Sequence, residues 1–159
     1  MSEINVNAKT TPKTTMKTEL WVSTSKDFTS PKQIFMVQEI PVFDPAKEPV
    51  NYGCLESSSE FQTEGTKKAE TLTIPILYVE AQHKELKEYE TNNTQLYFRV
   101  KLPDTTAESG SQPQCAEFGG TISLALDTLT QGDNMIQENM TVFKNTTVTW
   151  KTWTPVASL

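Results

Sequence analysis

The chain has 159 residues and a formal net charge of −6 at pH 7, from 14 Lys and Arg residues against 20 Asp and Glu residues. This length is typical of a single domain, and a hydrophobic fraction of 36% predicts a thin core. The acidic balance disfavours dedicated nucleic-acid binding, because that affinity comes mainly from Lys and Arg on phosphates, and Arg99 is the only arginine.

No stretch of the sequence approaches the ~18 apolar residues of a transmembrane helix, and residues 1–19 lack the apolar segment of a signal peptide. We therefore expect no membrane association and synthesis in a cytoplasm, where Cys54 and Cys115 stay reduced. Their spacing also fits an immunoglobulin-type disulfide, but the Trp that should follow the first cysteine in that fold is absent.

The chain begins with a polar segment and two candidate strands. Residues 1–17 are rich in Thr and Lys and lack periodicity, which predicts a flexible arm. A strand is predicted at residues 19–23 with Trp21 as its apolar anchor. Another is predicted at residues 33–40, which are apolar on both faces and hence central or covered on both sides.

A long polar excursion is predicted at residues 41–69. Three prolines within residues 41–53 block strand pairing and predict a loop there. The polar residues 54–69 fit either a strand or a loop. Segments of this length outside regular structure are usually functional or disordered.

The middle of the chain has the pattern of strand, helix and strand. Residues 70–79 alternate with period two, and Pro75 inside them predicts an edge strand or a bulge. Residues 80–90 combine strong helix formers with an acidic first turn, which predicts a short helix. Residues 94–102 return to alternation. The side chains predicted to face the core are Leu72, Ile74, Ile76 and Tyr78, then Val79, Leu86 and Tyr89, then Leu96, Phe98, Val100 and Leu102.

The C-terminal third is predicted to contain two strands. Residues 104–114 have the composition of a flexible loop, residues 118–129 alternate as a strand, and residues 135–150 form a long final strand with a bend or bulge near Lys144. Residues 154–159 are a short tail.

These elements predict a mainly β (α+β) fold. We expect two packed antiparallel sheets that form a sandwich or partial barrel, with one short α-helix, in one domain over residues 18–153. The 24 threonines agree with this prediction, because Thr favours strands on a half-buried surface.

The sequence lacks the patterns of a catalytic or metal site. His83 is the only histidine and lies on the predicted helix without a motif, so we expect a structural role for it. One His and two distant Cys do not make a zinc pattern. Gly119 and Gly120 form the only double glycine and indicate a bulge or close packing rather than a phosphate loop. We therefore expect no enzymatic activity and no cofactor.

Four segments of the chain follow one layout. A T-x-L-W-V strand after a polar arm occupies residues 18–22, and a long acidic loop enters a strand over residues 65–77. A helix then precedes an aromatic and basic strand that ends in proline, at residues 97–103. A Gly-containing strand and a Thr- and Val-rich strand close the domain at residues 119–150. This layout resembles the major tail tube protein of bacteriophages with long, flexible, non-contractile tails.

The resemblance implies a structural virion protein of the tail, assembled in the cytoplasm of the bacterial host. Such subunits form six-membered rings that stack into a hollow tube, with a tape-measure protein and with tail-tip and terminator proteins as partners. The strands of one ring join into a continuous inner barrel, which removes sheet edges. Double-stranded DNA passes through the channel without specific binding, since an acidic wall repels phosphates.

The resemblance also gives roles to two sets of residues. The long loop and both terminal arms would reach the adjacent ring, in a head-to-tail contact that yields an open filament. The candidate residues of the loop contact are Asp44, Glu48, Tyr52, Glu56, Glu60 and Phe61. The candidate acids of the channel wall are Glu56, Glu60, Glu117, Asp127 and Glu138.

Two alternatives remain open. The tube protein of a contractile tail or of a secretion-type injection system shares the general fold, and sequence alone separates the two poorly. A stand-alone β-sandwich binding module, for carbohydrate for example, usually displays several exposed aromatic side chains on one sheet face. Here Tyr97 is the only obvious outward aromatic side chain on a well-patterned strand.

Overall fold

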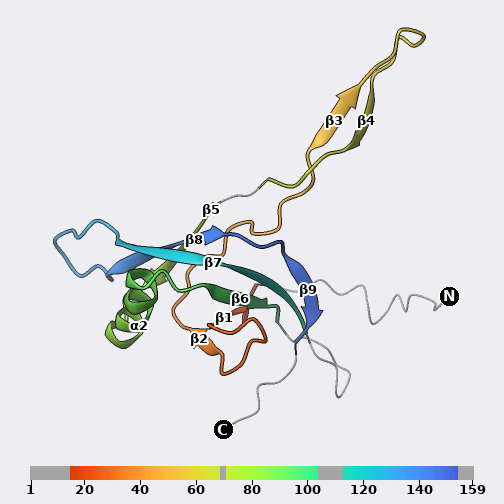
Figure 1. Ribbon diagram of the computed structural model, residues 1–159. Coiled ribbons are helices and arrows are strands. Elements are labelled where there is room, and N and C mark those ends of the chain that lie inside the picture. The colour runs from red at the N-terminus through yellow and green to blue at the C-terminus, as the bar shows by residue number, and fades with distance from the viewer. Residues whose placement is uncertain (1–14, 69–70, 104–112, 154–159) are drawn as a thin grey trace, which may run out of the picture.

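The computed structural model of the protein describes residues 15–68, 71–103 and 113–153 (Figure 1). The expected arm up to residue 14, most of the loop after residue 103 and the C-terminal tail lie outside the described residues. Within the described residues the chain is mainly β, with one helix and two antiparallel sheets, one large and one small. The expected fold class is thereby confirmed.

The large sheet has seven strands in the order β2-β1-β6-β7-β8-β5, with β9 also paired to β7. In chain order its strands are β1 (Glu19–Ser23), β2 (Lys32–Ile34), β5 (Thr71–Leu77), β6 (Leu96–Lys101), β7 (Gln114–Leu126), β8 (Gln137–Lys144) and β9 (Thr149–Thr152). The small sheet is a hairpin of β3 (Pro49–Tyr52) and β4 (Phe61–Glu64), and the helix α2 spans Glu80–Thr91.

The long strand β7 changes partners halfway along its length. Its first half pairs with β6 on one edge and β9 on the other, and its second half pairs with β8. The change falls at Gly120, where a Cβ atom would collide with the backbone carbonyl oxygen of Phe143. The close packing expected at this double glycine is therefore confirmed.

The large sheet curls until its two ends nearly meet, and we call this curled sheet the barrel. The chain just after β2 returns to β5, where Gln38 donates its N–H to the carbonyl of Pro75 at 2.9 Å and Leu77 donates to Met36 at 3.0 Å. The side of Pro75 that lacks an N–H faces this segment, so the proline breaks no bond to β8. Pro75 thus lies in an edge strand, as predicted, but the same chain covers part of that edge.

The barrel encloses most of the side chains that were predicted to face the core, but Tyr78 and Leu102 are only partly buried and Val79, before the helix, is exposed. The buried side chains include Leu72, Ile74 and Ile76 of β5, Leu96, Phe98 and Val100 of β6, Ile122 and Leu124 of β7, and Met140 and Val142 of β8. The rings of Phe98 and Phe118 stack with centroids 5.5 Å apart. Alternation succeeds for these side chains because every second residue of each strand faces the core.

The helix α2 packs on the barrel through Leu86, which is buried in the core. Two of its polar side chains fasten it to the chain around β2. The side-chain amide of Gln82 donates to the backbone carbonyl of Phe35 at 3.0 Å and accepts from its N–H at 2.8 Å. Glu85 forms an ion pair with Lys32. The side chains of the helix therefore bond backbone groups at this sheet edge, which a further strand would otherwise do.

A third helix residue covers the free edge of the second half of β7. The carboxylate of Glu90 accepts a hydrogen bond from the hydroxyl of Ser123 at 3.3 Å and lies near the backbone N–H of Leu124. Lys87 lies 2.8 Å from the same carboxylate and, with these donors, lowers the pKa of Glu90. Glu90 thus covers part of this edge, at Ser123 and Leu124.

Two expectations about the N-terminal strands are wrong. The predicted strand at residues 33–40 ends at Ile34, because Met36 has a positive φ of 62°, a conformation outside the strand region. It is an edge strand rather than a central one. Trp21 does not anchor β1 in the core: Leu20 and Val22 are buried there, and Trp21 packs on the opposite face.

Two further segments differ from the prediction. Residues 41–53 are not all loop, since Pro49 begins β3, and proline is tolerated at the first residue of a strand. The single strand predicted at residues 135–150 is two strands, β8 and β9. The break between them follows Lys144 directly, where a bend or bulge was predicted.

Candidate functional site

The hairpin of β3 and β4 projects away from the barrel (Figure 1). Its register pairs Pro49 with Glu64 and Tyr52 with Phe61, and every residue of both strands is exposed. A hairpin that is exposed on both faces buries almost nothing within its own chain, and an isolated two-stranded hairpin is only marginally stable. The hairpin is therefore the leading candidate for a surface that contacts a partner.

The far half of the hairpin, residues 52–61, exposes large apolar side chains, and we call it the hairpin tip. The rings of Tyr52 and Phe61 lie 5.8 Å apart and are 54% and 44% exposed. Leu55 is fully exposed in the connection between the strands. Apolar groups gathered in this way on a projecting element are typical of an interaction site.

The near end of the hairpin comprises residues 43–48 and 65–68, and we call it the root. It is fixed to the barrel by aromatic packing. The ring of Phe43 stacks on Phe118 with centroids 5.7 Å apart and lies 6.1 Å from Trp150 of β9. The ammonium group of Lys144 donates a hydrogen bond to the backbone carbonyl of Phe43 at 2.6 Å. The chain therefore leaves the barrel from a well-packed position.

Asp44 joins the two segments of the root to each other and to β9. Its carboxylate accepts hydrogen bonds from Lys67 at 2.7 Å and from the indole N–H of Trp150 at 2.9 Å. Both donors lower the pKa of Asp44 below the ordinary value of 3.8, with Lys67 contributing most. The root is closed further by the N–H of Gly65, which donates to the carbonyl of Glu48 at 2.6 Å.

Two exposed ion pairs lie along the stem of the hairpin. Lys47 and Glu64 are 2.7 Å apart, and Lys68 and Glu48 are 2.8 Å apart. Exposed pairs of this kind contribute ~0–1 kcal/mol each. The direction of the hairpin is thus set mainly by its backbone ladder and its root.

The structure divides the predicted contact residues into two groups. Asp44 and Glu48 are engaged within their own chain at the root. The other four lie exposed in the hairpin tip: Tyr52, Glu56, Glu60 and Phe61. Among the residues that the structure describes, neither glutamate of the tip has an ion-pair partner. Only the second group is available to a partner.

The prediction that Glu138 lines a channel is wrong. Glu138 is 2% exposed and lies on the core side of β8, with its carboxylate 2.5 Å from Nδ1 of His83. The ring of Tyr78 packs against the imidazole, with centroids 5.1 Å apart. The pair fastens α2 to the barrel. The alternation held a signal, since Glu138 shares a strand face with Met140 and Val142.

The remaining candidate acids do not form one surface within the subunit. Glu117 is largely covered on β7 and is paired with Arg99 and Lys151, so its charge is compensated. Asp127 is exposed after the end of β7, in the connection to β8 that Figure 1 places at the far side of the barrel from the hairpin. The two tip glutamates lie apart from both.

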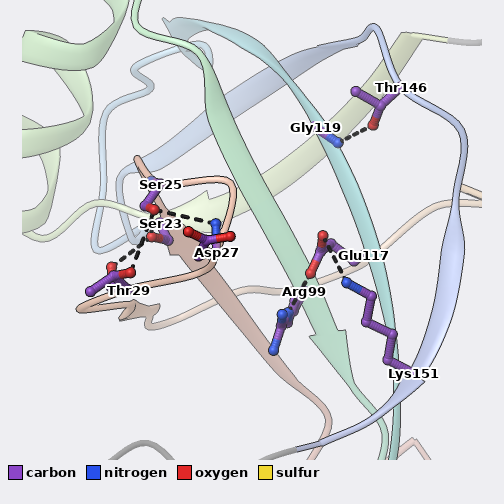
Figure 2. Close-up of polar contacts among 9 residues, drawn as sticks. All are labelled: Ser23, Ser25, Asp27, Thr29, Arg99, Glu117, Gly119, Thr146 and Lys151. Atoms are coloured by element: carbon purple, nitrogen blue, oxygen red, sulfur yellow. Dashed lines mark hydrogen bonds and ion pairs between the residues drawn. The ribbon is translucent and has the colours of Figure 1, made fainter.

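Figure 2 shows the pairing of Glu117 across the outer face of the barrel. One carboxylate oxygen accepts from Nε of Arg99 at 2.6 Å, and the other lies 3.3 Å from the ammonium of Lys151. The guanidinium of Arg99 also lies 4.2 Å from the ring centroid of Phe28. These charges are satisfied by their neighbours, which indicates a structural role for this face.

The loop after β1 holds Phe28 in place over this face. The hydroxyl of Ser23 donates to the carbonyl of Thr29 at 2.8 Å, and the backbone N–H of Asp27 donates to the hydroxyl of Ser25 at 3.2 Å (Figure 2). Phe28 has a positive φ of 57°, an unusual conformation for a bulky residue. The sequence offered no local signal for this cover.

Trp153 completes the cover of the outer face. Its ring lies 5.4 Å from that of Trp21 and 5.1 Å from the ammonium of Lys101. Cys115 is buried beneath these rings, and burial raises the pKa of its thiol. Cys54 lies exposed in the hairpin tip, and both thiols are free, so the immunoglobulin-type disulfide is wrong.

Three findings bear on other kinds of site. Within the described ranges, no group of three or more His, Cys, Asp or Glu side chains could hold a metal ion. None of the described helical segments is long and apolar enough to cross a membrane. Comparison with protein-family models gives no match, and comparison with curated protein sequences gives none.

Proposed function

We propose that this protein is a structural subunit that polymerises into a tube, of the kind formed by the major tail tube proteins of bacteriophages with long non-contractile tails. The observation that carries the proposal is the hairpin. A compact barrel presents a projecting element whose exposed tip combines Tyr52, Leu55 and Phe61. Apolar side chains held away from the core in this way serve a contact with another molecule.

The shape of the subunit favours assembly with copies of itself in one direction. The hairpin lies at one end of the molecule (Figure 1). A contact between such an arm and a different surface of a like subunit is heterologous, and heterologous contacts that do not close give open filaments. A stacked tube is one filament of this type.

A free edge on β9 supports lateral contacts within a ring. The N–H of Trp153 donates to the carbonyl of Pro113 at 2.8 Å. Because antiparallel pairs alternate, Trp150 and Thr152 turn their backbone groups away from β7. No described residue accepts or donates to these groups. An exposed strand edge is a template for pairing with another chain.

A second free edge lies on β5. The carbonyl of Pro75 faces away from β8. Because antiparallel pairs alternate, the backbone groups of Thr71 and Thr73 face away from β8 as well. The segment after β2 reaches only Pro75 and Leu77 among the described residues of this strand. We propose that the free edges of β5 and β9 join neighbouring subunits in a ring of six.

The charge of the chain fits a conduit for double-stranded DNA. A net charge of −6 repels phosphates, so the genome would slide through without adhesion. The proposed setting is the virion tail, assembled in the host cytoplasm with tape-measure, tail-tip and terminator proteins. Glu117 and Glu138 take no part in the proposed wall, because their carboxylates are engaged within the subunit.

The test of this proposal is assembly of the purified full-length protein. Sedimentation velocity and negative-stain electron microscopy over a series of rising concentrations should show rings and then tubes. Protein that stays strictly monomeric at every concentration and salt condition, with or without tail-tip proteins, would contradict the proposal.

A further inference from the structure

A cavity of about 530 Å³ lies beside the hairpin root, where the chain leaves β8 and turns toward β9. Three segments line it: Asp44 and Pro45, Lys67 and Lys68, and residues 144–148. The lining holds three lysines, Lys67, Lys68 and Lys144, against one carboxylate. The cavity is therefore a cationic site in a chain that is acidic as a whole.

Some of the donors in this cavity are not engaged by acidic groups of the chain. Two of the three lysines form the ion pairs of the root and stem described above. Lys144 instead bonds the neutral carbonyl of Phe43, so no carboxylate neutralises it directly. Thr147 is exposed in the lining and has no hydrogen bond to any described residue. A carboxylate that entered the cavity would find an ammonium group and a hydroxyl.

The opposite charge is carried by the hairpin tip. Glu56 and Glu60 lie exposed on the connection between β3 and β4 and, among the described residues, lack an ion pair. The three residues between them are serines, which have small side chains. The two paired strands hold this tip away from the root of its own chain (Figure 1).

We infer that the acidic hairpin tip of one subunit binds in the lysine-lined cavity at the hairpin root of the next subunit. Each copy offers one tip and one cavity, so the contact is directional and repeats without closing. The inference rests on the proposed function for the presence of like neighbours. It adds the receiving site on the neighbour and the charge complementarity that selects it.

A disulfide trap tests the contact directly. Cys54 is a natural thiol in the tip, and Thr147→Cys places a second thiol in the cavity without removing a hydrogen bond. Mild oxidation of the full-length variant should give dimers and longer covalent ladders on a non-reducing gel, lost on reduction. A disulfide requires the two Cα atoms to lie within ~7 Å, and an intrachain bond would leave only monomers.

Two controls belong to this trap. Thr24→Cys adds an exposed thiol on the loop after β1, away from the cavity, and should give no ladder. The wild-type chain should give none either, because Cys115 is buried and its thiol pKa is raised. Equal ladders from Thr24→Cys and Thr147→Cys would overturn the inference.

A charge exchange tests the complementarity. Thr147→Glu should raise the subunit concentration needed for tubes by about tenfold, since like charges brought together at an interface oppose association. Thr147→Lys has similar bulk and should assemble at least as well as the wild type. Adding Glu56→Lys and Glu60→Lys to Thr147→Glu should recover part of this loss, because the carboxylate at position 147 then faces lysines of the tip.

The outcomes separate this inference from the proposed function. Wild-type tubes together with unimpaired tubes from Thr147→Glu would overturn the inference and leave the proposed function standing. Strictly monomeric wild-type protein would overturn both. Binding of inorganic phosphate in the cavity, without any tip-to-cavity ladder, would make it a small-anion site and would also overturn the inference.

Discussion

The barrel and the hairpin belong to the same chain but differ in what stabilises them. In the barrel, strands that are distant in the sequence pair side by side, such as β1 with β6 and β5 with β8, and apolar side chains such as Ile74, Phe98 and Met140 are completely buried. In the hairpin, every residue of both strands is exposed, and what order it has comes from one ladder, two exposed ion pairs and an anchored root.

This difference separates what holds the subunit together from what it presents to others. Burial of apolar surface is the main stabilising contribution to folding, and the hairpin contributes almost none of it. Tyr52 and Phe61 would bury their rings only against another molecule. The hairpin can therefore be changed with little effect on folding, whereas the barrel cannot.

Removing the hairpin gives the largest expected effect on assembly. The carbonyl of Glu48 and the N–H of Gly65 are hydrogen-bonded across the root, so an Asn-Gly turn can replace residues 49–64 with little strain. We expect a folded monomer that forms no tubes at concentrations where the wild type forms them, as seen by electron microscopy and circular dichroism. Long tubes from the shortened chain would show that assembly does not depend on the hairpin, which contradicts this comparison.

Two phenylalanine truncations give the largest expected contrast in stability. Phe98→Ala should lower the free energy of unfolding by ~3–5 kcal/mol, because it leaves a cavity in the core. Phe61→Ala should lower it by no more than ~0.5 kcal/mol, because the ring is exposed. Urea unfolding of dilute monomer measures both values, and similar losses from the two variants would show that the hairpin belongs to the folding core.

The barrel was largely predictable from the sequence. Alternation predicted the core faces of β5 and β6, its interruption predicted the bend near Lys144, and helix propensity predicted α2. These signals are local, because strand and helix geometry fix which side chains share a face. Closure of the sheet by the segment after β2 was not predictable, since it depends on pairing between residues 36–38 and 75–77.

The candidate site was predictable only as a region. The prolines and polar residues after Ile40 indicated a long excursion, but β3 was missed and β4 was left open between strand and loop, because neither strand has a buried face to impose alternation. Glu138 was misplaced because its partner, His83, is distant in the sequence. A polar residue among buried apolar positions indicates that it has a polar partner, but the sequence does not show which residue the partner is.

Separation of His83 from Glu138 should have an intermediate effect. His83→Ala leaves a buried carboxylate without its partner, which should cost ~1–3 kcal/mol of unfolding free energy. Replacing both residues, with Glu138→Met in addition, should recover most of this loss, because no buried charge then remains. Urea unfolding of the two single variants and the double variant measures the coupling, and strictly additive losses would count against the pairing.

The smallest expected effect concerns the root, and it sharpens the comparison because it couples the hairpin to the barrel. The pKa of Asp44 in the folded chain lies below its ordinary value of 3.8, first because Lys67 donates to it and then because Trp150 does. The stabilisation is therefore complete above about pH 3.8 and is lost as the pH falls through the lowered pKa of the folded state. Asp44→Asn should cost less than ~1 kcal/mol at neutral pH, in view of its partly exposed ion pair, and should flatten this part of the pH profile.

The indole N–H resonance of Trp150 reports the same bond. A resonance that titrates in the wild type and not in Asp44→Asn would show that the carboxylate holds the root. If the profiles of both chains coincide, the root is fixed by the packing of Phe43 alone.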